Sequence, residues 1–213
     1  MNLDAAMQSN VVASPASLSF NAGAGTVNLT RNLTIANLSA SPDTYRITVA
    51  PLRTTVAPTL SLASVQIDAL RSRTIAVRLT AAGLPPGEYQ GFLLVQGTRP
   101  GSSMRVPYWY AVKSETPGVL RVLDSAPTGI AGEELQQAII FRVSDPSGVP
   151  LGNLSPTVTS VSNRGQVTNV YPQDVYFPGL YVADVVLGVA TGNNVFRIQI
   201  GELRAEVTIV GVR

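Results

Sequence analysis

A proline–glycine corner, followed two residues later by a tyrosine and then by an alternating strand, occurs twice in this chain. The first copy covers residues 86–89 and the second covers residues 178–181. This pattern is typical of the turn before a central strand of an immunoglobulin-like domain, where a buried tyrosine hydroxyl bonds back to the corner. Two copies predict two sandwiches, with Tyr89 and Tyr181 as structural corner residues.

Short alternating segments separated by turns fill the rest of both halves, and no segment has a helical period. The predicted fold class is therefore all-β, with two tandem immunoglobulin-like β-sandwich domains joined by a short linker. Pro15 is expected to split the first strand. Arg31 interrupts an apolar series and is expected to lie on an exposed edge or at a bulge. The expected strands are 11–20, 27–35, 45–49, 59–67, 75–79, 89–95, 104–112, 119–123, 138–143, 157–161, 167–171, 181–187, 196–200 and 203–212.

A length of 213 residues suits two domains of ordinary size, each able to bury its own core. The linker is expected to permit only restricted hinging because Pro117 stiffens it. We expect a disordered or vector-derived N-terminus over 1–9, a first sandwich over 10–113, a linker over 114–117 and a second sandwich over 118–213.

The chain contains no histidine and no cysteine. The commonest general base, the imidazole metal ligand and every Ser-His or Cys-His pair are therefore excluded. No acidic loop has the spacing of a calcium site. We predict no enzyme activity, no catalytic residues, no metal site and no cofactor. A net charge of +2 is too small to predict a nucleic-acid partner.

No apolar run approaches the roughly 18 residues that would predict membrane insertion. The first residues lack the basic start and apolar core of a signal peptide, so an export signal would lie outside this sequence. We therefore expect a part of a longer chain.

Residues 89–93, 104–108 and 29–37 give the first half a resemblance to known modules. It resembles the fibronectin-type-III-like modules near the C-termini of secreted bacterial subtilisin-like proteases. The second half resembles the bacterial immunoglobulin-like repeats of invasin and intimin stalks, through residues 132–146, 178–181, 192–201 and 203–207. These resemblances imply a secreted or cell-surface bacterial protein and a scaffold role.

Two groups of residues are candidates for a binding surface. On a strand, Trp109 points away from the face that Tyr108 and Tyr110 share, so it either caps a sheet edge or the domain junction, or forms a platform for a sugar or a partner. Arg71 and Arg73 lie close in sequence, with Arg78 nearby and Arg46 expected on the same sheet. They form either a solvated face or a site for an acidic glycan.

Three functions follow from these observations. The first is a non-catalytic accessory module that spaces neighbouring domains and contacts other domains of its parent chain or a surface protein. The second is a carbohydrate- or surface-binding adhesion module, which would add a glycan to the partners. The third is a periplasmic pilus-type chaperone that binds its partner by adding a strand.

Overall fold

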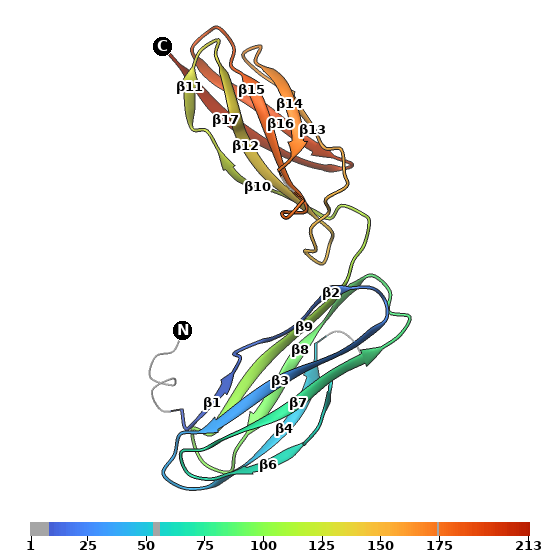
Figure 1. Cartoon of the computed structure of the whole chain (residues 1–213). Coiled ribbons are helices and arrows are strands. Elements are labelled where there is room, and N and C mark those ends of the chain that lie inside the picture. The colour runs from blue at the N-terminus through green and yellow to red at the C-terminus, as the bar shows by residue number, and fades with distance from the viewer. Residues whose placement is uncertain (1–8, 53–55, 174) are drawn as a thin grey trace. The chain divides into compact units, whose positions relative to one another are not determined.

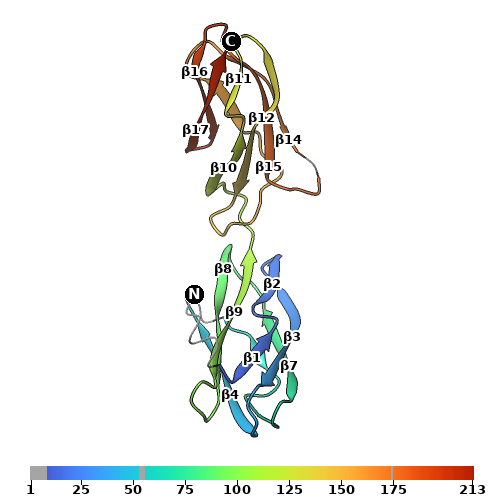
Figure 2. The same cartoon turned by 90° about the vertical axis from the view of Figure 1, so that its left-hand side faces the viewer.

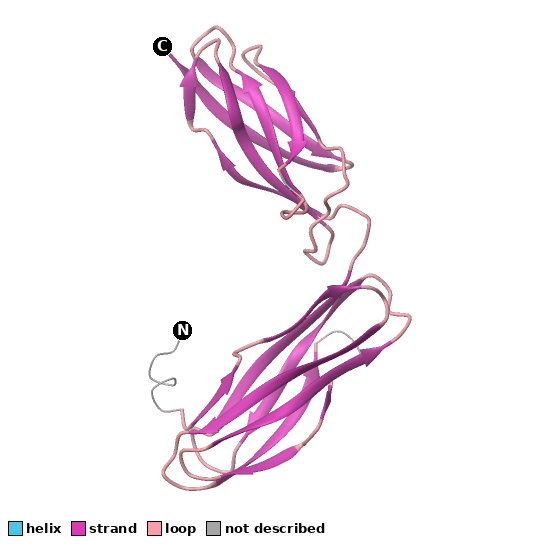
Figure 3. Ribbon diagram, viewed as in Figure 1, coloured by secondary structure: helices cyan, strands magenta, loops and turns pink. Residues whose placement is uncertain are grey.

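The computed structural model describes residues 9–52, 56–173 and 175–213, and every regular element within them is a β-strand (Figure 3). The described residues contain no helix long and apolar enough to cross a membrane. The chain divides into two compact units, Met1–Lys113 and Ser114–Arg213. Each unit consists of two facing sheets, which confirms the predicted fold class of two tandem immunoglobulin-like sandwiches (Figures 1 and 2).

The finer division of the chain stays a prediction, namely the N-terminal segment 1–9, the linker 114–117 and the domains on either side of it. Residues 1–8 of that N-terminal segment lie outside the described residues.

Unit 1 has a four-stranded and a five-stranded sheet. Their strand orders are β1-β3-β7-β5 and β2-β9-β8-β4-β6. All neighbouring strands are antiparallel except β2 and β9, which are parallel. The strands are β1 (Val11–Ser14), β2 (Leu18–Gly23), β3 (Val27–Asn37), β4 (Asp43–Pro51), β5 (Thr59–Leu60), β6 (Ser64–Ile67), β7 (Ser72–Ala81), β8 (Gly87–Gln96) and β9 (Ser103–Val112).

The first strand of unit 1 is split at Pro15 as predicted, and its two halves belong to different sheets. β1 pairs with β3, whereas β2 pairs with β9. At Arg31 the pairing of β3 with β7 is continuous, so the expectation of a bulge there is wrong. The other expectation fits, because β1 covers β3 only from Thr34 onward, so Arg31 lies on an uncovered edge of the sheet, where its side chain is half-buried. Its Nε donates to the Ser19 carbonyl at 2.8 Å.

The core of unit 1 is filled by inward side chains that alternate along each strand, with Tyr45, Tyr108 and Tyr110 among the largest. Gly91 shows why a glycine follows the tyrosine corner. A β-carbon at Gly91 would lie 2.4 Å from the Ala50 carbonyl oxygen and 2.7 Å from the Tyr108 hydroxyl. The close approach of β4 and the fit of Tyr108 therefore both require a residue without a side chain.

Unit 2 has two four-stranded sheets, with the orders β10-β12-β15-β14 and β11-β17-β16-β13. Its short parallel pair joins β11 to the last strand, as β2 joins β9 in unit 1. The strands are β10 (Val119–Ser125), β11 (Thr128–Ile130), β12 (Glu134–Ser144), β13 (Thr157–Ser160), β14 (Gln166–Pro172), β15 (Leu180–Val186), β16 (Gly192–Ile200) and β17 (Leu203–Val212).

The two proline–glycine–tyrosine corners precede strands that are not equivalent. Tyr89 lies on β8, beside the last strand of unit 1. Tyr181 lies on β15, in the sheet that does not contain the last strand of unit 2. The strand beside β17 is β16, and the turn before it has no such corner. The repeated motif therefore marks the entry into a strand but not the position of that strand in the sandwich.

Residues 114–118, the entry segment of unit 2, are fastened to the turn after β12. The fully buried Asp145 accepts the Ser114 N–H at 2.8 Å, and its other oxygen accepts the N–H groups of Ser147 and Val149. The Gly118 N–H donates to the Ser144 carbonyl at 2.9 Å. One carboxylate therefore organises the turn and holds the start of the entry segment against it.

Candidate binding surfaces

Trp109 lies on β9 in the five-stranded sheet of unit 1 and faces outward, because Tyr108 and Tyr110 point into the core. Its side chain is half-buried, and whether it caps an edge or forms a platform stays a prediction. Its direct neighbours across the sheet are Gln90 on β8 and Ser19 on β2.

Further apolar side chains share this outward face, and the sequence reasoning missed them. Phe92 and Leu94 on β8 are half-buried, and Pro107 on β9 lies directly opposite Phe92. We call Phe92, Leu94, Pro107 and Trp109 the outer apolar surface. The sequence contains a sign of this surface, because residues 91–95 include no polar residue. A strand with one fully solvated face would instead alternate apolar and polar residues.

One end of the outer apolar surface is basic. Arg105 lies directly opposite Leu94, and its guanidinium sits over the Phe92 ring at 5.6 Å from the centroid. Arg46 on β4 lies opposite Gln96, so it belongs to the same sheet as Arg105. A guanidinium stacked on an aromatic ring keeps its hydrogen-bonding edge available to a ligand.

The arginines singled out from the sequence lie elsewhere. Arg73 is on β7 in the opposite sheet, and Arg71 immediately precedes that strand. Both are exposed, and neither shares a sheet with Trp109. Arg78 on the same strand donates to the Asn28 side chain at 3.0 Å. The expectation that Arg46 joins this group is wrong, because strand pairing places it in the five-stranded sheet.

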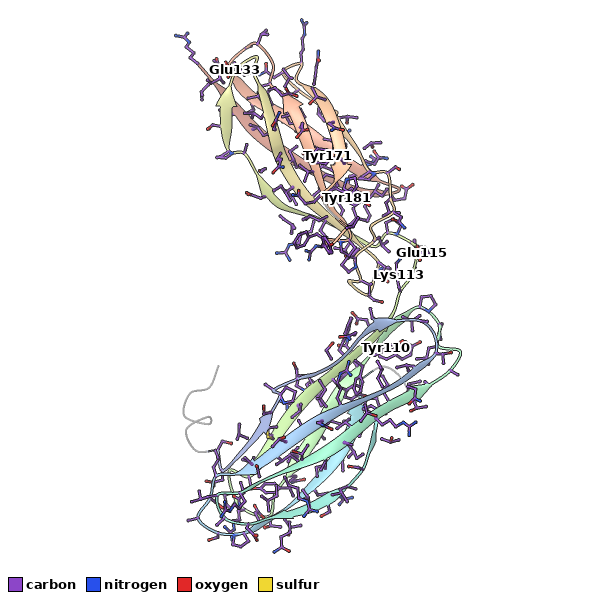
Figure 4. The ribbon with its side chains drawn as sticks, viewed as in Figure 1. Tyr110, Lys113, Glu115, Glu133, Tyr171 and Tyr181 are labelled. Atoms are coloured by element: carbon purple, nitrogen blue, oxygen red, sulfur yellow. The ribbon has the colours of Figure 1, made fainter. Side chains whose placement is uncertain are left out.

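Both corner tyrosines use their hydroxyl groups, but in different ways. The Tyr89 hydroxyl donates to the Pro85 carbonyl at 2.7 Å, within its own corner, and burial raises its pKa. Tyr181, labelled in Figure 4, bonds to a different segment. Its hydroxyl donates to the Leu151 carbonyl and accepts the Leu154 N–H, both at 3.0 Å. Tyr181 therefore anchors the β12–β13 connection rather than the corner just before it, which corrects the expected partner.

Unit 2 has an exposed apolar segment in the loop between β14 and β15. Val175, Tyr176 and Phe177 are 87%, 83% and 56% exposed. Val175 and Phe177 border a groove of about 360 Å³, whose other described lining residues are Gly152, Asn153, Pro172, Pro178 and Gly179. Three consecutive large apolar side chains on a loop are suited to contact with another protein.

The buried carboxylate of unit 1 has a structural role. Asp43 accepts the Thr98 hydroxyl at 2.5 Å, the Thr98 N–H at 3.1 Å and the Thr44 N–H at 2.8 Å. Burial alone would raise the pKa of Asp43, but these hydrogen bonds outweigh it and hold the pKa below 3.8. Asp43 thereby ties β4 to the β8–β9 hairpin. Within the described residues, no three His, Cys, Asp or Glu side chains cluster as metal ligands.

No protein-family model and no curated protein matches the sequence. Solved structures with a similar fold include PapD-like domain 7 of human CEP192, at 14% identity and a TM-score of 0.43, covering 49% of this chain and 85% of that one. A protein of unknown function from Porphyromonas gingivalis W83 has 14% identity and a TM-score of 0.43, covering 95% and 99%. The YadV chaperone has 16% identity and a TM-score of 0.42, covering 93% and 99%. These low scores carry no argument about function.

Proposed function

We propose that this chain is a non-catalytic accessory or structural module of a larger secreted or cell-surface bacterial protein. It spaces neighbouring domains and makes protein–protein contacts, with other domains of its parent chain or with a surface protein as partners. The resemblances to fibronectin-type-III-like modules of secreted subtilisin-like proteases and to invasin/intimin-type repeats support this role. These likenesses concern scaffold residues. Support for the proposal therefore comes from the connection and from the exposed surfaces.

The observation that supports the proposal is that hydrogen bonds attach the entry segment to the rest of unit 2. A spacer has to limit the freedom of the chain that connects its modules. Here the Ser114 N–H binds a buried carboxylate, and the Gly118 N–H binds the Ser144 carbonyl. A β-carbon at Gly118 would lie 2.4 Å from the Pro146 nitrogen, so the segment packs directly on the turn. Both ends of the entry segment are therefore held by the turn after β12.

Cell fractionation tests the spacer role. Cells that make the protein are separated into cytoplasm, envelope and medium, and each fraction is blotted with antibody to this chain. We expect a band much larger than 22.4 kDa in the envelope or the medium. A band near 22.4 kDa would contradict a module of a longer chain.

We assign the protein–protein contacts to the exposed segment formed by Val175, Tyr176 and Phe177. Aromatic side chains supply large contact areas and are enriched at protein interfaces. Because this chain has no cysteine, a Val175→Cys variant carries a single reporter thiol. We expect maleimide to label it rapidly in the isolated chain and at least about tenfold more slowly in the parent protein on cells. Val189→Cys is the matched control, since Val189 is 90% exposed in another loop. Equal labelling of both variants on cells would refute the contact.

A specific observation also favours the chaperone alternative. β2 pairs with β9 only from Tyr108 onward. Among the described residues, no strand therefore pairs with the earlier part of β9 on the side away from β8, although β1 also contacts β9. An extended peptide added there would complete the sheet. A band near 22.4 kDa confined to the periplasm would favour this function over the spacer.

A further inference from the structure

The basic end of the outer apolar surface contains a shallow groove between β8 and β9. Its volume is about 280 Å³, and its lining includes Leu94, Gln96, Ser103 and Arg105. It therefore combines an apolar floor with an amide, a hydroxyl and a guanidinium. A concave site with a few convergent polar groups on an apolar base is the usual form of a ligand site.

Arg105 lines this groove, Arg46 lies opposite its lining residue Gln96, and neither has a carboxylate partner within the described residues. Arg105 lies on β9 and Arg46 on β4, on either side of β8, and both are exposed. On β8, the outward carboxylate is Glu88, which lies at the opposite end of the strand and accepts Gln90 Nε2 at 2.8 Å. The groove thus lies at the end of the face where cations gather, which favours an anionic ligand.

Arg105 is also preorganised for an anion. Its stacking on Phe92 holds the long side chain in place, so less rotational freedom is lost when a ligand binds. A guanidinium presents paired N–H groups that match the two oxygens of a carboxylate. Both the charge and the geometry are therefore suited to a carboxylate.

The remainder of the groove is suited to a sugar ring. Leu94 presents apolar surface in the groove against which the C–H face of a pyranose can lie. Gln96 and Ser103 are exposed and offer an amide and a hydroxyl to the ring hydroxyl groups. The groove lies on an open sheet face, which a long chain can cross in either direction.

We propose that this site, formed by Arg46, Leu94, Gln96, Ser103 and Arg105, binds uronic-acid residues of an acidic polysaccharide. The sequence alone predicts such a ligand at Arg71 and Arg73, and Arg73 lies on the other sheet. The inference goes beyond the spacer function and does not rest on it, because a spacer needs no ligand on this face.

Isothermal titration calorimetry of the whole chain with polygalacturonate oligomers tests the site. We expect binding that weakens as salt concentration rises, since exposed charges are screened. Arg105→Ala and Arg46→Ala should each weaken binding by about 10-fold, the equivalent of one charge-assisted hydrogen bond. Arg105→Lys should recover only part of the loss, because lysine keeps the charge but lacks the paired donors.

Arg73→Ala is the matched control, as it removes the same charge from an exposed strand residue on the opposite sheet. It should change the affinity less than twofold. The absence of binding to polygalacturonate would overturn the proposal, as would an equal loss in Arg73→Ala, which indicates net charge alone. Equal binding of neutral dextran would also overturn it. Equal binding of poly-glutamate would overturn it as well, in favour of an acidic peptide as the ligand. Circular dichroism of each variant confirms that the fold is retained.

Discussion

Removing the hydroxyl group of each corner tyrosine in turn measures how much stability its hydrogen bonds contribute. Tyr89→Phe deletes one hydrogen bond, from the hydroxyl to the Pro85 carbonyl at 2.7 Å. Tyr181→Phe deletes two, because its hydroxyl both donates to the Leu151 carbonyl and accepts the Leu154 N–H. Each change keeps the ring and its packing, so the difference in stability reports the hydrogen bonds.

The expected magnitudes follow from the environments of those partners. One hydrogen bond contributes about 1 kcal/mol on average, so we expect about 1 kcal/mol for Tyr89→Phe. At Tyr181 the two backbone groups left unpaired are buried or partly buried, and each costs about 1–1.5 kcal/mol to leave unsatisfied. We therefore expect about 2–3 kcal/mol for Tyr181→Phe. With a urea dependence of about 1.5 kcal/mol per molar, the midpoints should fall by about 0.7 M and about 1.3–2 M.

Urea unfolding of the whole chain distinguishes the two units through one natural reporter. Trp109 is the single tryptophan and lies in unit 1, so its emission follows the unfolding of that unit alone. Far-UV circular dichroism follows both units. Tyr89→Phe should move the Trp109 transition, whereas Tyr181→Phe should leave it in place and lower the other transition. The reasoning is refuted if Tyr181→Phe costs no more than Tyr89→Phe, or if it moves the Trp109 transition.

Substitutions at three further positions test the remaining polar and close contacts. Asp145→Ala removes the acceptor of three backbone N–H groups, so the transition of unit 2 should lose about 3–5 kcal/mol, and Asp145→Asn should lose less because one oxygen remains. Asp43 has a lowered pKa when folded, so its contribution is present above about pH 4 and lost as pH falls through that lowered value. The Trp109 transition should therefore weaken on acidification more in the natural chain than in Asp43→Asn. Gly91→Ala forces a β-carbon to 2.4 Å from the Ala50 carbonyl oxygen and should cost at least about 2 kcal/mol in the same assay.

The fold was predictable because it depends on local patterns. Alternating segments and turn residues at regular spacing specify many short strands, and two sets of them specify two sandwiches. The pairing of those strands is a long-range property, and this explains why Arg46 was expected on the wrong sheet. In β4 the alternation of Tyr45, Arg46 and Ile47 correctly predicts an exposed arginine, but it contains nothing about which strand lies alongside.

The binding surfaces were less predictable for the same reason. Trp109 was recognised as outward-facing from its neighbours on one strand. Phe92 and Leu94 of the outer apolar surface lie on a second strand, and the register of Phe92 with Pro107 and of Leu94 with Arg105 appears only in the folded sheet. The apolar run at 91–95 was the available signal. A continuous apolar run is typical of a strand covered on both faces, so this run predicts that Phe92 and Leu94 lie beneath a partner or a ligand rather than in open solvent.

The different partners of the two tyrosines bear directly on the spacer proposal. Tyr89 bonds four residues back, so it stabilises a corner that its own sequence already encodes. Tyr181 bonds to Leu151, thirty residues back, and thereby holds the connection that leads from β12 to β13. The same connection begins with Asp145, whose carboxylate holds Ser114. The entry segment is therefore fastened to a loop that is itself fastened to the core of unit 2. If this series of hydrogen bonds holds the entry segment, Tyr181→Phe should speed amide exchange at Ser114 as well as at Leu154. Faster exchange at Leu154 alone would show that the effect ends within the β12–β13 connection.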